Sequence, residues 1–135
     1  VGYGIGDPAI VELIHRIKPP FAVSAVAERL ALAALEDTEF ASRTLEDCAR
    51  EKRFFYEELG NLGLGYVPSH TNFVLVDTGR DCREVFRRLL AKGLIVRPAD
   101  QYGLPTSIRV TLGRREDNER LFQELPQVLA GLPSQ

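Results

Sequence analysis

The segment Leu94–Gly113 constrains the fold most, because it predicts two strands that one turn-rich loop brings side by side. The two apolar runs, Leu94–Arg97 and Ser107–Leu112, are rich in β-branched and aliphatic residues. Such runs, when glycine and proline separate them, are typical of strands joined by a hairpin-like connection. Each run carries one arginine, Arg97 in the first and Arg109 in the second. The sequence therefore predicts a sheet that contains a pair of arginines.

A pair of arginines on apolar strands has two interpretations. A guanidinium is expensive to bury without a partner, so two of them brought together by one loop indicate a site for a doubly charged oxyanion. Each planar guanidinium can bind two oxygens of such an anion. The alternative is that both side chains point to solvent on a polar face of the sheet, and composition alone favours this second interpretation.

The rest of the chain predicts helices around this sheet. From residue 66 onward the expected order is strand, helix, strand, strand, helix, which is typical of a small two-layer α/β unit (α+β-like) with helices on one face of its sheet. The other predicted elements are a strand at 1–6, helices from Pro8 and over Ala25–Leu35, a long amphipathic helix over Glu39–Leu62, a strand at Asn72–Val76, a helix between Asp81 and Gly93, and a last helix after Gly113. We expect two parts, residues 1–38 and residues 39–135, with the long helix as the connection.

The charged residues of the long helix favour a solvated surface over a binding site, because their spacing allows ion pairs along one helix. They are Arg43, Glu46, Asp47, Arg50 and Glu51. Leu45 and Cys48 fall at the apolar positions of the same helix. We interpret Cys48 as a small core residue.

Composition and charge exclude several classes of function. A chain of 135 residues is expected to form about one domain. A net charge of −2 gives no case for a nucleic-acid partner or an acidic membrane surface, and no apolar run is long enough for a transmembrane helix. Cys48 and Cys82 lack metal-binding or redox spacing, so we expect no metal site and a reducing, cytoplasmic compartment. Because residue 1 is not methionine, we expect that it is not a native translation start.

Three stretches of the chain resemble a known enzyme family. They are VGYGIGDPAIVELIHRIKPPFAVS, VPSHTNFVLVDTG and GLIVRPADQYGLPTSIRVTLGRREDNERL. In this order and spacing they resemble the C-terminal part of the histidinol-phosphate aminotransferases, which are class I/II, fold-type-I enzymes that use pyridoxal 5'-phosphate. The resemblance covers essentially the whole chain. It implies that the sheet described above belongs to the small C-terminal domain of that fold and that residues 1–38 are a remnant of the large cofactor-binding domain.

The resemblance also implies where catalytic groups lie. In this family the Schiff-base lysine and an arginine that contacts the cofactor phosphate precede the V-G-Y-G segment, so both would fall upstream of Val1. The lysines present are Lys18, Lys52 and Lys92, and none is at the family's position. The resemblance therefore implies no catalytic residue in this chain, which alone is expected to be inactive.

What the resemblance carries onto this chain is an anion site. Arg109 matches the arginine that grips the anionic end of the substrate, and Arg97 matches a second arginine that helps hold the phosphate. The implied reaction of the intact enzyme is a ping-pong transamination between histidinol phosphate and 2-oxoglutarate or glutamate, in histidine biosynthesis. A cytoplasmic homodimer is implied as well.

Other polar residues carry weaker interpretations. Tyr3 is a candidate for cofactor contact through its hydroxyl, or it packs beside the first helix. His15 suits the C-terminal turn of a helix, and His70 is expected in an exposed loop. Asn72 matches an Asn-Phe pair of the family, and we interpret it as structural. Tyr102 either closes over substrate or lies in a solvent-exposed turn.

Several alternative functions stay open at this point. Within the same fold, a threonine-phosphate decarboxylase or an aromatic aminotransferase would share the same pattern. In another class, a stand-alone module would use the arginine pair to bind phosphate or carboxylate without chemistry. A purely structural dimerisation piece is a third possibility.

Overall fold

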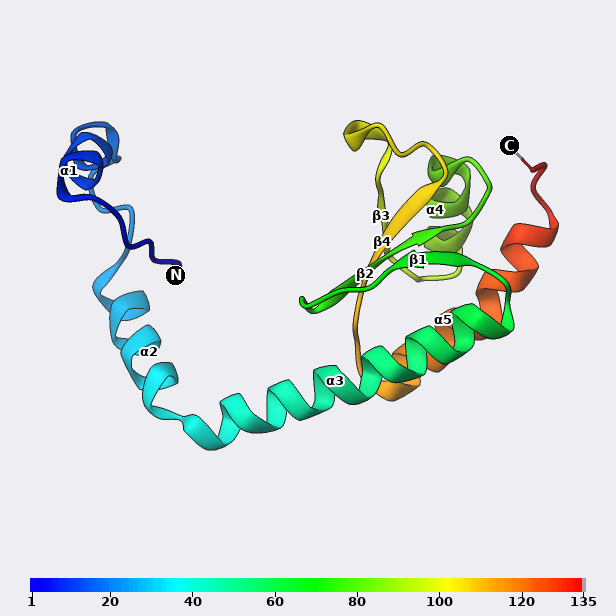
Figure 1. The fold of residues 1–135 in the computed structure, drawn as a ribbon, viewed down its shortest axis with the longest axis horizontal. Helices are drawn as coiled ribbons and strands as arrows, with labels where there is room; N and C mark the ends of the chain where they lie inside the picture. The colour runs from blue at the N-terminus through cyan, green and yellow to red at the C-terminus, as the bar shows by residue number, and fades with distance from the viewer. Residues whose placement is uncertain (135) are drawn as a thin grey trace. The chain divides into compact units, whose positions relative to one another are not determined.

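The chain divides into two compact units in the computed structural model, which describes residues 1–134 (Figure 1). Unit 1 is Val1–Arg43 and unit 2 is Thr44–Gln135. The boundary falls within the long helix α3 (Thr38–Asn61). The two units are described separately below.

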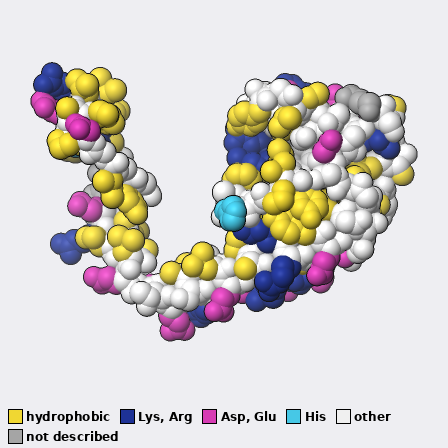
Figure 2. Space-filling model, in the orientation of Figure 1, with side chains coloured by type: hydrophobic (Ala, Val, Ile, Leu, Met, Phe, Trp, Pro, Cys, Tyr) yellow, Lys and Arg dark blue, Asp and Glu magenta, His cyan; other side chains and the backbone are white. Residues whose placement is uncertain are grey.

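Unit 1 consists of short capped helices whose apolar faces are exposed. Helix α1 (Pro8–Ile17) begins after Asp7, whose carboxylate accepts a 2.8 Å hydrogen bond from a backbone N–H of the first turn, as an N-cap should. Ser24 caps α2 (Ala25–Glu36) in the same way. Neither helix has a buried residue, and hydrophobic side chains cover much of both (Figure 2). The predicted strand at 1–6 is wrong: these residues pair with no strand, and a strand needs a partner for its backbone groups.

Unit 2 is built on a four-stranded antiparallel sheet with the strand order β1-β2-β4-β3. The strands are β1 (Gly65–Val67), β2 (Phe73–Asp77), β3 (Arg97–Pro98) and β4 (Ser107–Thr111). Successive side chains of a strand point to opposite faces. Val74 and Val76 of β2 are buried on one face, beside Ile108 and Val110 of β4.

Helices cover this face of the sheet and close the core. They are the C-terminal part of α3, α4 (Cys82–Ala91) and α5 (Arg115–Ala130). Phe55 and Leu59 of α3, Leu89 of α4 and Leu125 of α5 are all at most 1% exposed. Each such side chain stabilises the fold by about 1.5–3 kcal/mol relative to an exposed one. The predicted two-layer arrangement, with helices on one face, is confirmed.

Two predicted strands differ in extent from the structure. Strand β1 was not expected, and β3 is shorter than the predicted strand Leu94–Arg97. The reason lies in the end of α4, where Gly93 has a φ of 77° and the N–H groups of Gly93 and Leu94 donate 2.9 Å hydrogen bonds to the last turn. This Schellman arrangement uses the first residue of the predicted strand to end the helix. Val96 then turns into the core, where it is 7% exposed.

Candidate functional site

Arg97 and Arg109 lie directly opposite each other on the neighbouring antiparallel strands β3 and β4. Residues in this relation have Cβ atoms about 4.5–5.5 Å apart and point to the same face of the sheet. Like charges in directly opposite positions destabilise a sheet. An anion bound by both guanidinium groups would remove this repulsion, so the register itself favours an anion site.

The arginine pair is on the face of the sheet that the helices leave open. Arg109 alternates along β4 with the buried Ile108 and Val110, so its side chain belongs to the opposite face. Leu75 of β2 lies next to Arg109, and Val67 of β1 lies next to Leu75. Val67 is 56% exposed. Across this face, the residues at this level are therefore apolar on β1 and β2 and cationic on β4 and β3.

The side chain of Arg109 is half-buried and lacks an acceptor. Its Nε atom is buried and has no hydrogen-bond partner among the described residues. Its guanidinium carbon lies 4.9 Å from the centre of the Phe73 ring, a distance at which cation and ring attract each other. A buried donor without an acceptor costs about 1–3 kcal/mol. An oxyanion at this position would supply the missing acceptor.

Arg97 is exposed, and its neighbour is an aromatic ring of the connecting loop. Its guanidinium carbon lies 5.9 Å from the centre of the Tyr102 ring. Tyr102 ends the short 3-10 helix η1 (Asp100–Tyr102), and Gly103 follows it with a φ of 77°. Within residues 1–134 no carboxylate forms an ion pair with either Arg97 or Arg109. The exposed-turn interpretation of Tyr102 agrees with its 63% exposure, and the ring also borders the arginine site.

An ion pair stands beside Arg97. Arg83 of α4 donates from Nε to Asp100 Oδ2 at 2.7 Å, and its Nη2 atom lies 2.6 Å from the same oxygen. This hydrogen bond lowers the pKa of Asp100 below its usual value. Arg83, Arg97 and Asp100 line one open groove. No sequence pattern indicated this pair, because its two residues come from different elements.

The other sequence candidates are all exposed. Tyr3 is 86% exposed and lines a hollow on α2 within unit 1, so it does not pack beside the first helix as a core residue. His15 lies in the last turn of α1 and His70 is exposed, as expected. The backbone carbonyl of Asn72 accepts the N–H of Leu112, which fits a structural role.

Two of the three lysines are engaged with other groups of the chain. Lys52 donates from Nζ to the backbone carbonyl of Ser69 at 3.0 Å. Lys92 forms a 2.6 Å ion pair with Glu124, and Lys18 is the exposed C-cap of α1. Among residues 1–134, no group of three or more metal-ligating side chains is placed to hold a metal ion. In the same part of the chain, no helix has the length and apolar character needed to cross a bilayer.

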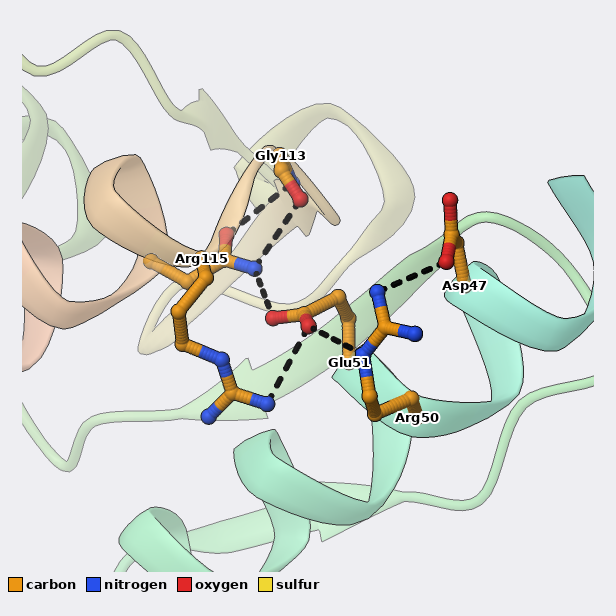
Figure 3. Close-up of polar contacts among 6 residues, drawn as sticks. Asp47, Arg50, Glu51, Gly113 and Arg115 are labelled. Carbon is orange, nitrogen blue, oxygen red and sulfur yellow. Dashed lines mark hydrogen bonds and ion pairs between the residues drawn. The ribbon is translucent and has the colours of Figure 1, made fainter. Parts of the chain in front are cut away.

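Glu51 contradicts the prediction of a solvated charged face on the long helix. It is only 4% exposed, and its Oε2 atom accepts a 2.9 Å hydrogen bond from the side-chain amide of Asn118 (Figure 3). Its Oε1 atom lies 3.1 Å from Arg115 and 3.4 Å from Arg50; these are ion-pair contacts that lack hydrogen-bond geometry. The helix spacing could not reveal this, because the burying partner comes from α5.

Two other predictions for the long helix are wrong as well. Leu45, expected at an apolar position, is 72% exposed, because it lies on the part of α3 before the core contacts begin. Cys48 is half-buried and is not part of the core, so its interpretation as a core residue is wrong. Its Sγ atom lies 3.7 Å from the carbonyl oxygen of Thr71. Cys82 is buried in the core of unit 2.

Comparison with known proteins gives a consistent result. Residues 1–125 match the family model described as aminotransferase class I and II. The chain is 43% identical over 130 residues to the histidinol-phosphate aminotransferase of Moorella thermoacetica, covering 96% of this chain and 34% of that protein. It is also 43% identical over 129 residues to the enzyme of the same name from Caldicellulosiruptor saccharolyticus, with 96% and 36% covered.

A solved structure with a similar fold is that of histidinol-phosphate aminotransferase from Sinorhizobium meliloti in complex with pyridoxal-5'-phosphate. The TM-score is 0.80 at 27% identity, and the match covers 91% of this chain and 35% of that one. The chain thus spans about a third of the length of the proteins that it matches.

Proposed function

Since this chain belongs to the aminotransferase class I and II family, we propose that it is the C-terminal part of a pyridoxal-phosphate-dependent aminotransferase and supplies the arginines that bind the anionic end of the substrate. The observation that carries this proposal is the pair itself. Arg97 and Arg109 face each other across two strands, and Arg109 keeps a buried Nε donor without an acceptor.

The proposed substrates are histidinol phosphate and 2-oxoglutarate or glutamate, in histidine biosynthesis. Relatives named histidinol-phosphate aminotransferase support this choice over a threonine-phosphate decarboxylase or an aromatic aminotransferase. A phosphate monoester carries up to two negative charges near neutral pH, and two guanidinium forks can bind its oxygens together. In the other half-reaction the same two residues would bind a carboxylate. In this proposal β3 and β4 position both substrates, because rigid strands fix the guanidinium groups.

The described residues do not form a complete cofactor site. Pyridoxal phosphate supplies an electron sink when it is bound, and a Schiff base to it requires a lysine in a desolvated pocket. Lys52 and Lys92 are engaged with Ser69 and Glu124, and Lys18 is exposed. We therefore assign to this chain the binding and orientation of substrate, and expect no catalysis by the chain alone.

The domain assignment and assembly are part of the same proposal. Residues 1–38 would belong to the large domain of the intact enzyme and residues 39–135 to the small domain, joined by α3. The exposed apolar stripe of α1, with Leu13 and Ile17 at 60% and 82% exposure, supports this, because isolated soluble domains rarely leave large apolar patches open. A cytoplasmic homodimer would be the functional form.

An assay of the full-length protein tests the proposal. We expect amino-group transfer from histidinol phosphate to 2-oxoglutarate, and we expect Arg109→Ala to weaken binding of the phosphate-bearing substrate by about 2–5 kcal/mol, as when one member of a buried charge pair is removed. Arg53→Ala is the matched control, because Arg53 is exposed on α3. Unchanged affinity in the Arg109 variant would contradict the assignment.

A further inference from the structure

We propose that Arg83 is a positioning residue that holds the carboxylate of Asp100 and thereby keeps Arg97 available for the anionic group of the substrate. The inference rests on the proposed function, because it takes Arg97 as a ligand of that group. Substrate binding would then depend on Arg83 of α4 as well as on the two arginines of β3 and β4.

Asp100 borders the same groove as the arginine that the substrate needs. Asp100 opens η1 and follows Arg97 by three residues. Tyr102, at the other end of η1, has its ring 5.9 Å from the guanidinium carbon of Arg97. The short helix η1 thus presents the carboxylate of Asp100 to the groove that Arg97 also lines.

A carboxylate in this position would compete with substrate. Asp100 is the one acidic residue among those that line the groove, and an Asp–Arg pair forms readily between groups held close together. Within residues 1–134 Arg97 has no ion-pair partner. Arg87 is the other cation of the groove, and it is engaged with Glu84 at 2.5 Å. Without Arg83, Arg97 is therefore the cation of this groove that Asp100 would find without an acidic partner.

The contacts of Arg83 prevent this competition. Two of its nitrogens, Nε and Nη2, contact the same oxygen of Asp100 at 2.7 and 2.6 Å. The hydrogen bond lowers the pKa of Asp100; if the carboxylate were released it would lose this effect, but the ordinary pKa of an aspartate, about 4, would still leave it charged at neutral pH and able to compete. The Arg83 side chain is 69% exposed, so the pair contributes little to stability. The role of the pair is instead to keep the carboxylate of Asp100 bound to Arg83 and not to Arg97.

A double-mutant cycle in the full-length protein tests this role. The variants are Arg83→Gln, Asp100→Asn and the combination, with inorganic phosphate as the binding probe and histidinol phosphate as the substrate. We expect Arg83→Gln to raise the Kd for phosphate and the KM for histidinol phosphate about threefold to fivefold, as for an exposed ion pair, with kcat unchanged. Adding Asp100→Asn should restore both values. Asp100→Asn alone should change them little, because Arg83 already occupies the carboxylate.

Two further variants separate this effect from loss of charge or of structure. Arg87→Gln removes a positive charge from the same groove and should leave KM unchanged, and Arg83→Lys should keep most of the wild-type affinity. Wild-type KM in Arg83→Gln, or a raised KM that Asp100→Asn does not restore, would overturn the inference. The proposed function fails separately: it is contradicted if Arg97→Ala and Arg109→Ala leave phosphate affinity unchanged, whatever Arg83 does.

Discussion

Glu51 and Asn118 are 67 positions apart in the sequence, and a buried 2.9 Å hydrogen bond joins their side chains. Asn118 also accepts a 2.9 Å hydrogen bond from the N–H of Gly113, which follows the strand that carries Arg109. One amide therefore connects the long helix to the end of the arginine strand (Figure 3). This connection fixes the position of β4 relative to α3 and α5.

Removing the Glu51 carboxylate should destabilise unit 2. In Glu51→Ala the amide of Asn118 and the guanidinium of Arg115 lose a buried partner, and the loss of one member of such a group costs about 3 kcal/mol. Urea unfolding of the chain, followed by circular dichroism, measures this difference. Glu57→Ala on the exposed side of the same helix should stay within about 0.5 kcal/mol of wild type. Equal stability of the two variants would show that the buried group contributes nothing.

Two glycines should respond to alanine in opposite directions. Gly93 has a φ of 77° at the end of α4, so Gly93→Ala should destabilise by about 1–2 kcal/mol because an L side chain is strained there. Gly60 lies inside α3 with nothing within 4 Å of an added Cβ, so Gly60→Ala should stabilise by about 0.5–1 kcal/mol. Thermal unfolding of both variants compares the signs. A stabilising Gly93→Ala would rule out the proposed strain.

The ring of Phe73 should contribute to anion binding through Arg109. Phe73→Leu keeps an apolar side chain but removes the ring that lies 4.9 Å from the guanidinium carbon. We expect phosphate affinity to fall about twofold to fivefold, the effect of a partly exposed cation–π contact. Titration of the full-length protein with phosphate measures it. Val67→Ala, on the same face but two strands away, should have no effect, and equal losses in both variants would argue against a specific contact.

The contribution of the Arg83–Asp100 pair to the free energy of unfolding should depend on pH. Because the pKa of Asp100 is lowered in the folded state, this contribution is fully present above the unfolded pKa of about 4 and is lost as pH falls through the lower folded value. Asp100→Asn should therefore be slightly less stable than wild type at pH 7, because the pair is exposed, with the small difference shrinking below about pH 4. Unfolding midpoints measured from pH 7 to pH 2.5 test this. A difference that grows in acid would have the wrong sign.

Local signals predicted most of unit 2 correctly. Asp81 caps α4 by accepting 3.0 and 2.9 Å hydrogen bonds from two N–H groups of its first turn, and Gly93 ends that helix in the left-handed conformation. These features depend on neighbours within a few residues, which the sequence displays directly. The strand at 1–6 was wrong and β1 was missed because strand formation depends on a distant partner.

The sequence by itself determined the types of groups in the candidate site: two arginines on apolar strands, one loop between them, and the family to which the chain belongs. Tertiary structure decided how those groups meet. The register of β3 and β4 sets Arg97 opposite Arg109, α4 brings Arg83 to Asp100, and α5 buries Glu51. Each of these depends on contacts between different elements, and helical or strand periodicity reports only on the face of a single element. The sequence identifies the charged residues, and packing decides which of them lie next to one another.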